Sequence, residues 1–222
     1  GKAVYLLNRD WVEVQAGGQF GGAVREGHAP AGAPFAVMES APLYDIVRDV
    51  NKLSNNVMAR QMFLTLATAR HPPPATPALA AAVVRDWLQE RKIAMPGLVL
   101  ENGSGLSRQE RATAGGLAQL LAAADASPYR DEFASSLAVA AMDGTMQRRF
   151  VNGSVAGQAL LKSGSLEGVR ALAGYVIDPE GRRFYVVAMI NHPNAARGNA
   201  ALDYLVQWVY HEARRWDPAL HK

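Results

Sequence analysis

The chain of 222 residues contains no cysteine, which excludes a disulfide framework, a thiolate nucleophile and a zinc site built on cysteine. No apolar run approaches the ~20 residues that a membrane-spanning helix needs. The five histidines are scattered, and none has a metal-ligand partner three or four residues further along the chain. The sequence therefore predicts no transmembrane segment, no bound metal and no cofactor.

The charge is too small and too dispersed for a nucleic-acid-binding protein. Lysines and arginines number 23 against 20 aspartates and glutamates, which gives a formal net charge of +3. The basic pairs, such as Arg148-Arg149 and Arg182-Arg183, lie far apart, whereas nucleic-acid binding requires a contiguous basic face. With 49% apolar and 19% charged residues, the composition is that of an ordinary globular protein.

From residue 39 onward, apolar spacing and turn residues predict helices followed by strands. Helices are expected over residues 42–51, 57–69, 78–93 and 113–124, after Ser127-Pro128, and over residues 197–214. Residues 138–145 are expected to turn toward a further helix that runs through residue 150. Strands are expected over residues 98–100, 159–166, 169–177 and 184–190. The predicted buried face of the first helix comprises Leu43, Ile46, Val47 and Val50. Short connections make the last three strands antiparallel, so the predicted fold class is α+β, an antiparallel sheet packed with helices.

The strand at residues 160–166 places a lysine, two hydroxyl groups and a glycine among apolar residues. A core strand would exclude Lys162, because a buried ammonium costs several kcal/mol unless it is paired. The pattern suits a strand that lines a cleft, with Lys162 directed at an anion and Gly164 allowing another backbone to approach. An edge strand with a protective lysine explains the same residues.

Ser54-Asn55-Asn56 interrupts two apolar helices. Because asparagine is unfavourable inside a helix but effective as a cap, Ser54 or Asn55 capping the second helix is one explanation. A polar group held in an interhelical turn for function is the other. Gly103-Ser104-Gly105 and His192-Pro193 are interpreted as turns, since the first lacks the remainder of a phosphate-binding loop or nucleophile elbow.

Five ordered blocks of the sequence resemble one protein family. They are Ser40-Ala41-Pro42-Leu43, Ser54-Asn55-Asn56, the turn at residues 102–108, Asp143-Gly144-Thr145 and Lys162-Ser163-Gly164. The second and fifth blocks match the second and third active-site signatures of serine penicillin-binding proteins and β-lactamases. Together the blocks resemble the class C low-molecular-mass penicillin-binding proteins, which are D-alanyl-D-alanine carboxypeptidase/endopeptidases. The turn at residues 102–108 is interpreted as structural, without a chemical role.

The first signature of that family, Ser-x-x-Lys, carries the nucleophilic serine, and this chain lacks it. The residues three positions before Lys52, Lys92, Lys162 and Lys222 are aspartate, glutamine, alanine and alanine. The resemblance therefore implies the C-terminal part of such an enzyme, inactive by itself. We expect a segment of the same protein that carries Ser-x-x-Lys, and the start at Gly1 rather than Met suggests a processed or truncated polypeptide.

The resemblance implies catalytic roles for three residues. Ser54 would relay a proton toward the leaving amine of the substrate. Asn56 would hold the missing lysine and the substrate amide. Lys162 would keep the electrostatic field of the site positive and help to bind the terminal carboxylate.

It implies substrate-binding roles for three more. The Ser163 hydroxyl would donate a hydrogen bond to the same carboxylate. Gly164 would let the substrate backbone lie against the strand, and the backbone N–H of Ser165 would complete the oxyanion hole.

By the same resemblance, the expected activity is that of a penicillin-sensitive, serine-type D-Ala-D-Ala carboxypeptidase/endopeptidase acting on peptidoglycan stem peptides through an acyl-enzyme. The expected fold is β-lactamase/transpeptidase-like and incomplete without the N-terminal part, and the expected location is the periplasm. Residues 1–38 would be the end of an inserted domain with its return linker. Residues 39–222 would be the C-terminal part of the catalytic domain, with a helical region at 40–150 and the sheet and closing helix at 158–216. A β-lactamase-like hydrolase of the same fold and a non-catalytic peptidoglycan-binding fragment are the alternatives.

Overall fold

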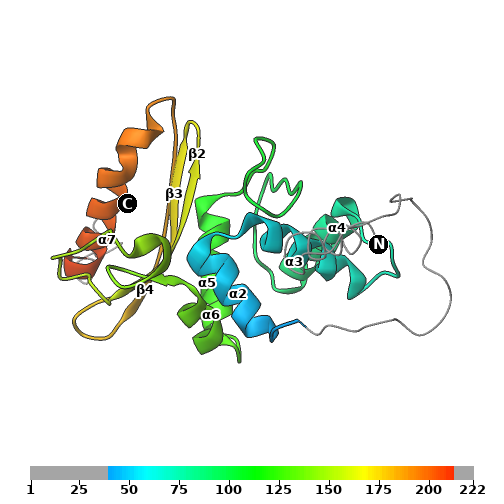
Figure 1. Ribbon diagram of the computed structural model, residues 1–222, viewed down its shortest axis with the longest axis horizontal. Coiled ribbons are helices and arrows are strands. Elements are labelled where there is room, and N and C mark those ends of the chain that lie inside the picture. Colours follow the sequence, from blue (N-terminus) through cyan, green and yellow to red (C-terminus); the bar gives the residue numbers. More distant parts are fainter. Residues whose placement is uncertain (1–39, 213–222) are drawn as a thin grey trace, which may run out of the picture. The chain divides into compact units, whose positions relative to one another are not determined.

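A computed structural model describes residues 40–212, so the interpretation of residues 1–38 and the last residues of the closing helix lie outside the described range. The helices are α2 (Leu43–Leu53), α3 (Asn56–Thr68), α4 (Pro77–Glu90), α5 (Ala114–Asp125), α6 (Arg130–Ser136) and α7 (Asn199–Glu212). The strands are β1 (Ala138–Val139), β2 (Ala159–Leu166), β3 (Val169–Ile177) and β4 (Arg183–Asn191). The predicted order, helices followed by an antiparallel sheet and a closing helix, is confirmed (Figure 1).

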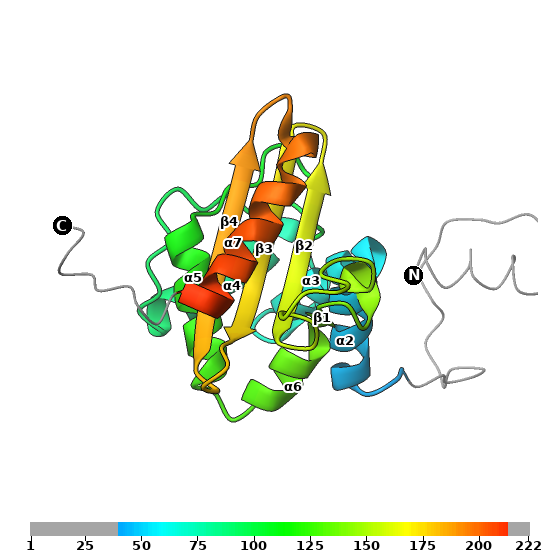
Figure 2. The ribbon, with the colours of Figure 1, turned by 90° about the vertical axis from the view of Figure 1, so that its left-hand side faces the viewer.

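The sheet has the order β1-β2-β3-β4 and is antiparallel throughout, as the short connections predicted. α7 covers one face, whereas α5 and α6 lie on the other, with α2 beside them (Figures 1 and 2). β2 pairs with β3 along its whole length, but β1 faces only Leu160 and Leu161. The second half of β2 therefore has a strand neighbour on one side only among the described residues.

Alternating side chains of the sheet supply two cores. On the α7 side, Leu161 and Val176 are fully buried and belong to a cluster that includes Val206 of α7. On the opposite side, Tyr175 packs with Leu121 of α5 and donates a hydrogen bond from its hydroxyl to the Leu121 carbonyl oxygen at 2.9 Å. Burial raises the pKa of Tyr175 to about 12, with a smaller contribution from the charge of Asp125, so this hydroxyl remains protonated at physiological pH.

Three local predictions were wrong. Residues 98–100 form only an isolated bridge between Val99 and Arg111 rather than a strand. The helix expected to follow the turn at residues 138–145 is only the short 3-10 helix η2 (Gly144–Met146), with β1 before it, because Gly144 takes a positive φ of 53° that interrupts an α-helix. Leu43, predicted to lie on the buried face of the first helix, is 68% exposed. Periodicity identifies the apolar stripe of a helix, but it does not show how far along that stripe another element packs.

Candidate active site

A pocket of about 540 Å³ lies where the end of α2, the start of α3, the turn at residues 103–106 and β2 meet. Its lining contains all six residues predicted from the two signatures: Ser54, Asn56, Lys162, Ser163, Gly164 and Ser165. A hydrogen bond between Lys162 and Ser54 joins the two signatures, although these residues are 108 positions apart in the sequence. The fold thus brings the predicted residues into one site, and their individual roles stay predictions.

In the Ser-Asn-Asn turn, one residue caps α3 and a different residue faces the pocket. Ser54 follows α2 in the left-handed conformation, with φ 55° and ψ 47°, which is uncommon for a residue other than glycine. This places the next residue, Asn55, at the N-cap of α3, where its side chain accepts a hydrogen bond from the Met58 N–H at 3.0 Å. Because Asn55 supplies the cap, the Ser54 hydroxyl is available to the pocket.

Lys162 points into the pocket, which argues against a purely protective edge lysine. Its Nζ donates to the Ser54 Oγ at 2.5 Å and to the Ser163 carbonyl oxygen at 3.0 Å. Among residues 40–212, no carboxylate lies within ion-pair distance of this ammonium. Burial lowers the pKa of Lys162 below its ordinary value of 10.5, because the partly desolvated site disfavours the charged form. An anionic ligand would restore the missing counter-charge.

The open edge of β2 presents backbone groups to the same pocket. The carbonyl oxygen of Ala159 accepts a hydrogen bond from the N–H of Ala140, on the β1 side of the strand. Backbone groups alternate in direction along a strand, so those of Ser163 and Ser165 point to the same side as those of Ala159. β1 pairs only with Leu160 and Leu161, so it does not extend alongside Ser163 and Ser165. The N–H of Ser165 therefore faces an unpaired edge to which an extended peptide could add.

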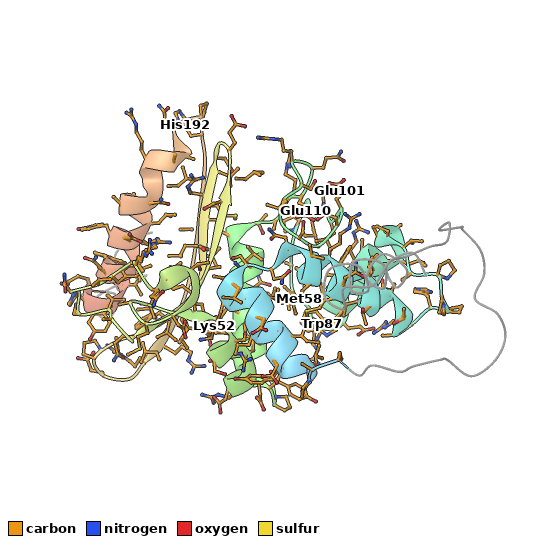
Figure 3. All side chains as sticks on the ribbon, in the orientation of Figure 1. Lys52, Met58, Trp87, Glu101, Glu110 and His192 are labelled. Carbon is orange, nitrogen blue, oxygen red and sulfur yellow. The ribbon has the colours of Figure 1, made fainter. Side chains whose placement is uncertain are left out.

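The turn at residues 103–106 forms a wall of the pocket, which sequence reasoning missed. The Glu110 carboxylate accepts a hydrogen bond from the Gly103 N–H at 3.0 Å. Figure 3 labels Glu101 and Glu110, which lie on either side of this turn in the sequence. Gly103 has a φ of 70°, and a Cβ there would lie 2.4 Å from the Phe63 side chain. The predicted turn is present, but its tight packing on α3 also sets the shape of the site. Its membership of a family block was the available signal.

Thr145 also lines the pocket. No role was predicted for it, although the Asp-Gly-Thr block that contains it was one of the five blocks of the resemblance. Its Oγ1 accepts a hydrogen bond from the Ser163 Oγ at 3.0 Å. By contrast, the exposed His192 lies outside this pocket, beyond β4 (Figure 3), where its Nδ1 accepts a hydrogen bond from the Asn194 N–H. The interpretation of His192 as a turn residue agrees with this geometry.

Residues 40–212 contain no cluster of three or more histidines, aspartates or glutamates arranged to hold a metal ion. Within the same range, no helix has both the length and the apolar character required to cross a membrane.

Residues 3–211 match the family described as D-Ala-D-Ala carboxypeptidase 3 (S13). The chain belongs to this family. It is 32% identical over 180 residues to carboxypeptidase DacB of Mycolicibacterium smegmatis and 28% identical over 180 residues to D-alanyl-D-alanine carboxypeptidase DacB of Haemophilus influenzae. These alignments cover 78% and 80% of this chain but only 39% and 38% of the two relatives, so the chain of this S13 family member spans about two fifths of their length.

Solved structures show which fold the chain has. Penicillin-binding protein 4 of Haemophilus influenzae in complex with a β-lactam matches 95% of the S13 chain and 50% of its own chain, with a TM-score of 0.77 and 24% identity. A predatory peptidoglycan endopeptidase of Bdellovibrio bacteriovorus matches 78% of the S13 chain and 44% of its own, with a TM-score of 0.59 and 23% identity. The fold is therefore that of the penicillin-binding proteins, as expected.

Proposed function

We propose that the protein is a penicillin-sensitive, serine-type D-Ala-D-Ala carboxypeptidase/endopeptidase that acts on peptidoglycan stem peptides. The observation that carries this proposal is the Lys162–Ser54 hydrogen bond inside a pocket lined by both signatures, in a chain of the S13 family. The names of the carboxypeptidase relatives and of the endopeptidase neighbour supply the substrate class. Such an enzyme works in the periplasm, where peptidoglycan lies.

Proton transfer to the leaving amine is assigned to Ser54. A serine hydroxyl has one proton and two lone pairs, and Ser54 uses a lone pair to accept from Lys162. Its own proton is therefore directed elsewhere, toward the leaving amine of a bound peptide. Because burial lowers the pKa of Lys162, this ammonium gives a proton back to Ser54 more readily than an exposed lysine.

Substrate binding is assigned to the β2 wall and to the start of α3. The peptide adds to the open edge of β2, its carboxylate bound by Lys162 and the Ser163 hydroxyl, and its scissile carbonyl oxygen by the Ser165 N–H. Gly164 keeps side-chain bulk off this wall. Asn56, the first residue of α3, holds the substrate amide because its side chain both donates and accepts hydrogen bonds.

The nucleophile is assigned to a Ser-x-x-Lys segment outside residues 1–222, since no lysine of this chain has a serine three positions before it. That serine gives its proton to the lysine of the same segment as it attacks the carbonyl between the two D-alanines. The amine leaves with a proton from Ser54, and water then hydrolyses the acyl-enzyme and regenerates the serine hydroxyl. The same absence favours a second candidate function, a peptidoglycan-binding protein that uses this groove without chemistry.

Labelled penicillin discriminates between these functions in the complete native protein. The proposed enzyme forms one stable acyl adduct per molecule, and unlabelled D-Ala-D-Ala peptide slows its formation. Repeated rapid turnover of penicillin would identify a β-lactamase-like hydrolase of the same fold. Absence of an adduct, together with retained binding of peptidoglycan peptides, would establish the non-catalytic function and refute the proposal.

A further inference from the structure

The short helix η2 is attached to the end of α2 by the side chain of Asp143. One carboxylate oxygen of Asp143 accepts a hydrogen bond from the Val139 N–H at 2.8 Å. The other forms an ion pair with the Nζ of Lys52, which lies on the side of α2 that faces the sheet (Figure 3). Lys52 is two residues before Ser54, so the same ion pair connects the element that holds Ser54 with the element that holds Thr145.

The residues on both sides of Thr145 restrict its backbone. Gly144 approaches α2 so closely that a Cβ there would lie 2.6 Å from the carbonyl oxygen of Lys52. Met146, on the other side, is fully buried in the core beneath β2. Thr145 itself is exposed and lines the pocket. Its β-branched side chain has few rotamers, so a fixed backbone also fixes the direction of its hydroxyl.

We propose that Thr145 is a positioning residue of the carboxylate-binding wall and acts through the hydroxyl of Ser163. This inference rests on the proposed function, because it concerns recognition of a peptide's terminal carboxylate. In this structure the Ser163 Oγ donates its single proton to the Thr145 Oγ1 at 3.0 Å. Thr145 thereby selects the rotamer of the Ser163 side chain, which lines the same pocket as Lys162.

Carboxylate binding then requires only that two hydroxyl groups rotate, with no proton transferred. Ser163 turns its proton to the carboxylate, and Thr145 donates its own proton to the Ser163 Oγ in its place. A hydrogen bond to an anion is stronger than a neutral one, and a donor chain behind it strengthens it further. Thr145 therefore contributes to affinity for the free carboxylate without contacting the scissile bond.

Thr145→Val removes the hydroxyl and keeps the branched shape, whereas Thr145→Ser restores the hydroxyl without the methyl group. In the complete protein, we expect Thr145→Val to raise KM for a D-Ala-D-Ala peptide about tenfold and to change kcat less than about twofold, because the hydrogen bond from Ser163 to the charged carboxylate loses the donor behind it. Thr145→Ser recovers most of that loss. A merely structural role would instead lower kcat and the melting temperature in both variants.

A double-mutant cycle with Ser163→Ala tests whether Thr145 acts through Ser163. Affinity is measured for the peptide acid and for the same peptide with a C-terminal amide. We expect Thr145→Val to weaken binding of the acid in the wild-type background only, and to leave binding of the amide almost unchanged. Additive effects of the two substitutions, with the preference for the acid intact, overturn this inference alone. A wild-type protein without any preference for the acid overturns both the inference and the proposed function.

Discussion

Leu161 and Lys162 are neighbours on β2, yet the structure assigns them different contributions. Leu161 is fully buried in the core beneath α7, so Leu161→Ala should cost about 2–5 kcal/mol in the free energy of unfolding. Lys162→Met keeps the length of the side chain and removes a desolvated charge, so stability should not fall. Acylation by penicillin should fall by a factor on the order of 10²–10⁴, the contribution of a general acid or base. Unfolding in urea and acylation kinetics on the same samples measure both quantities, and an unchanged acylation rate in Lys162→Met would contradict the assignment.

The lowered pKa of Lys162 makes a prediction about pH. Below the lowered pKa the group is charged in both the folded and the unfolded state, so the folded state bears the whole desolvation cost. As the pH rises from the lowered pKa toward 10.5, the folded state releases its proton first, and the free energy of unfolding rises relative to a variant without the group. The difference in unfolding free energy between wild type and Lys162→Met should therefore move in favour of wild type across this range. A constant difference would show that the pKa is not lowered.

The left-handed backbone of Ser54 lowers the stability of the protein, and substitutions can separate this effect from the role of the hydroxyl in acylation. Glycine adopts this conformation freely, so Ser54→Gly should be more stable than Ser54→Ala by about 1 kcal/mol. Both variants lack the hydroxyl and should be acylated slowly. Equal melting temperatures of the two variants would show that Ser54 stores no backbone strain.

At the scale of elements, the contact between η2 and α2 is predicted to support the site. Gly144→Ala introduces both an unfavourable φ and a Cβ at 2.6 Å from the Lys52 carbonyl oxygen, so it should lower stability by more than about 1 kcal/mol. It should also slow acylation, because Thr145 and Ser54 lie on the two displaced elements. Gly115→Ala in α5 is the matched control.

A Cβ at Gly115 meets open space, and alanine has a helix propensity about 1 kcal/mol better than glycine, so this control should be neutral or stabilising. Thermal unfolding and penicillin labelling of both variants provide the comparison. If Gly144→Ala is as stable and as reactive as Gly115→Ala, then η2 has no role in arranging the pocket.

Across the whole molecule, local patterns predicted the elements better than their contacts. The three long strands were predicted because their apolar runs and connecting turns are local. β1 was missed because a two-residue strand depends on its pairing with Leu160 and Leu161, about 20 residues away. The Lys162–Ser54 contact spans 108 residues, and only the family signatures indicated that these two residues belong to one site. Thr145 and the wall at residues 103–106 had no assigned role, because residues alone do not show which turns reach the same pocket.

The central claim is that this chain supplies the second and third signature groups of an acyl-enzyme whose nucleophile lies in a Ser-x-x-Lys segment. The most direct test is to label the complete native protein with penicillin and to locate the adduct by peptide mass spectrometry. We predict a single acylated serine, in a Ser-x-x-Lys sequence outside residues 1–222, and much slower formation of that adduct in Lys162→Met. An adduct on Ser54, Ser163 or any other serine of this chain would contradict the account.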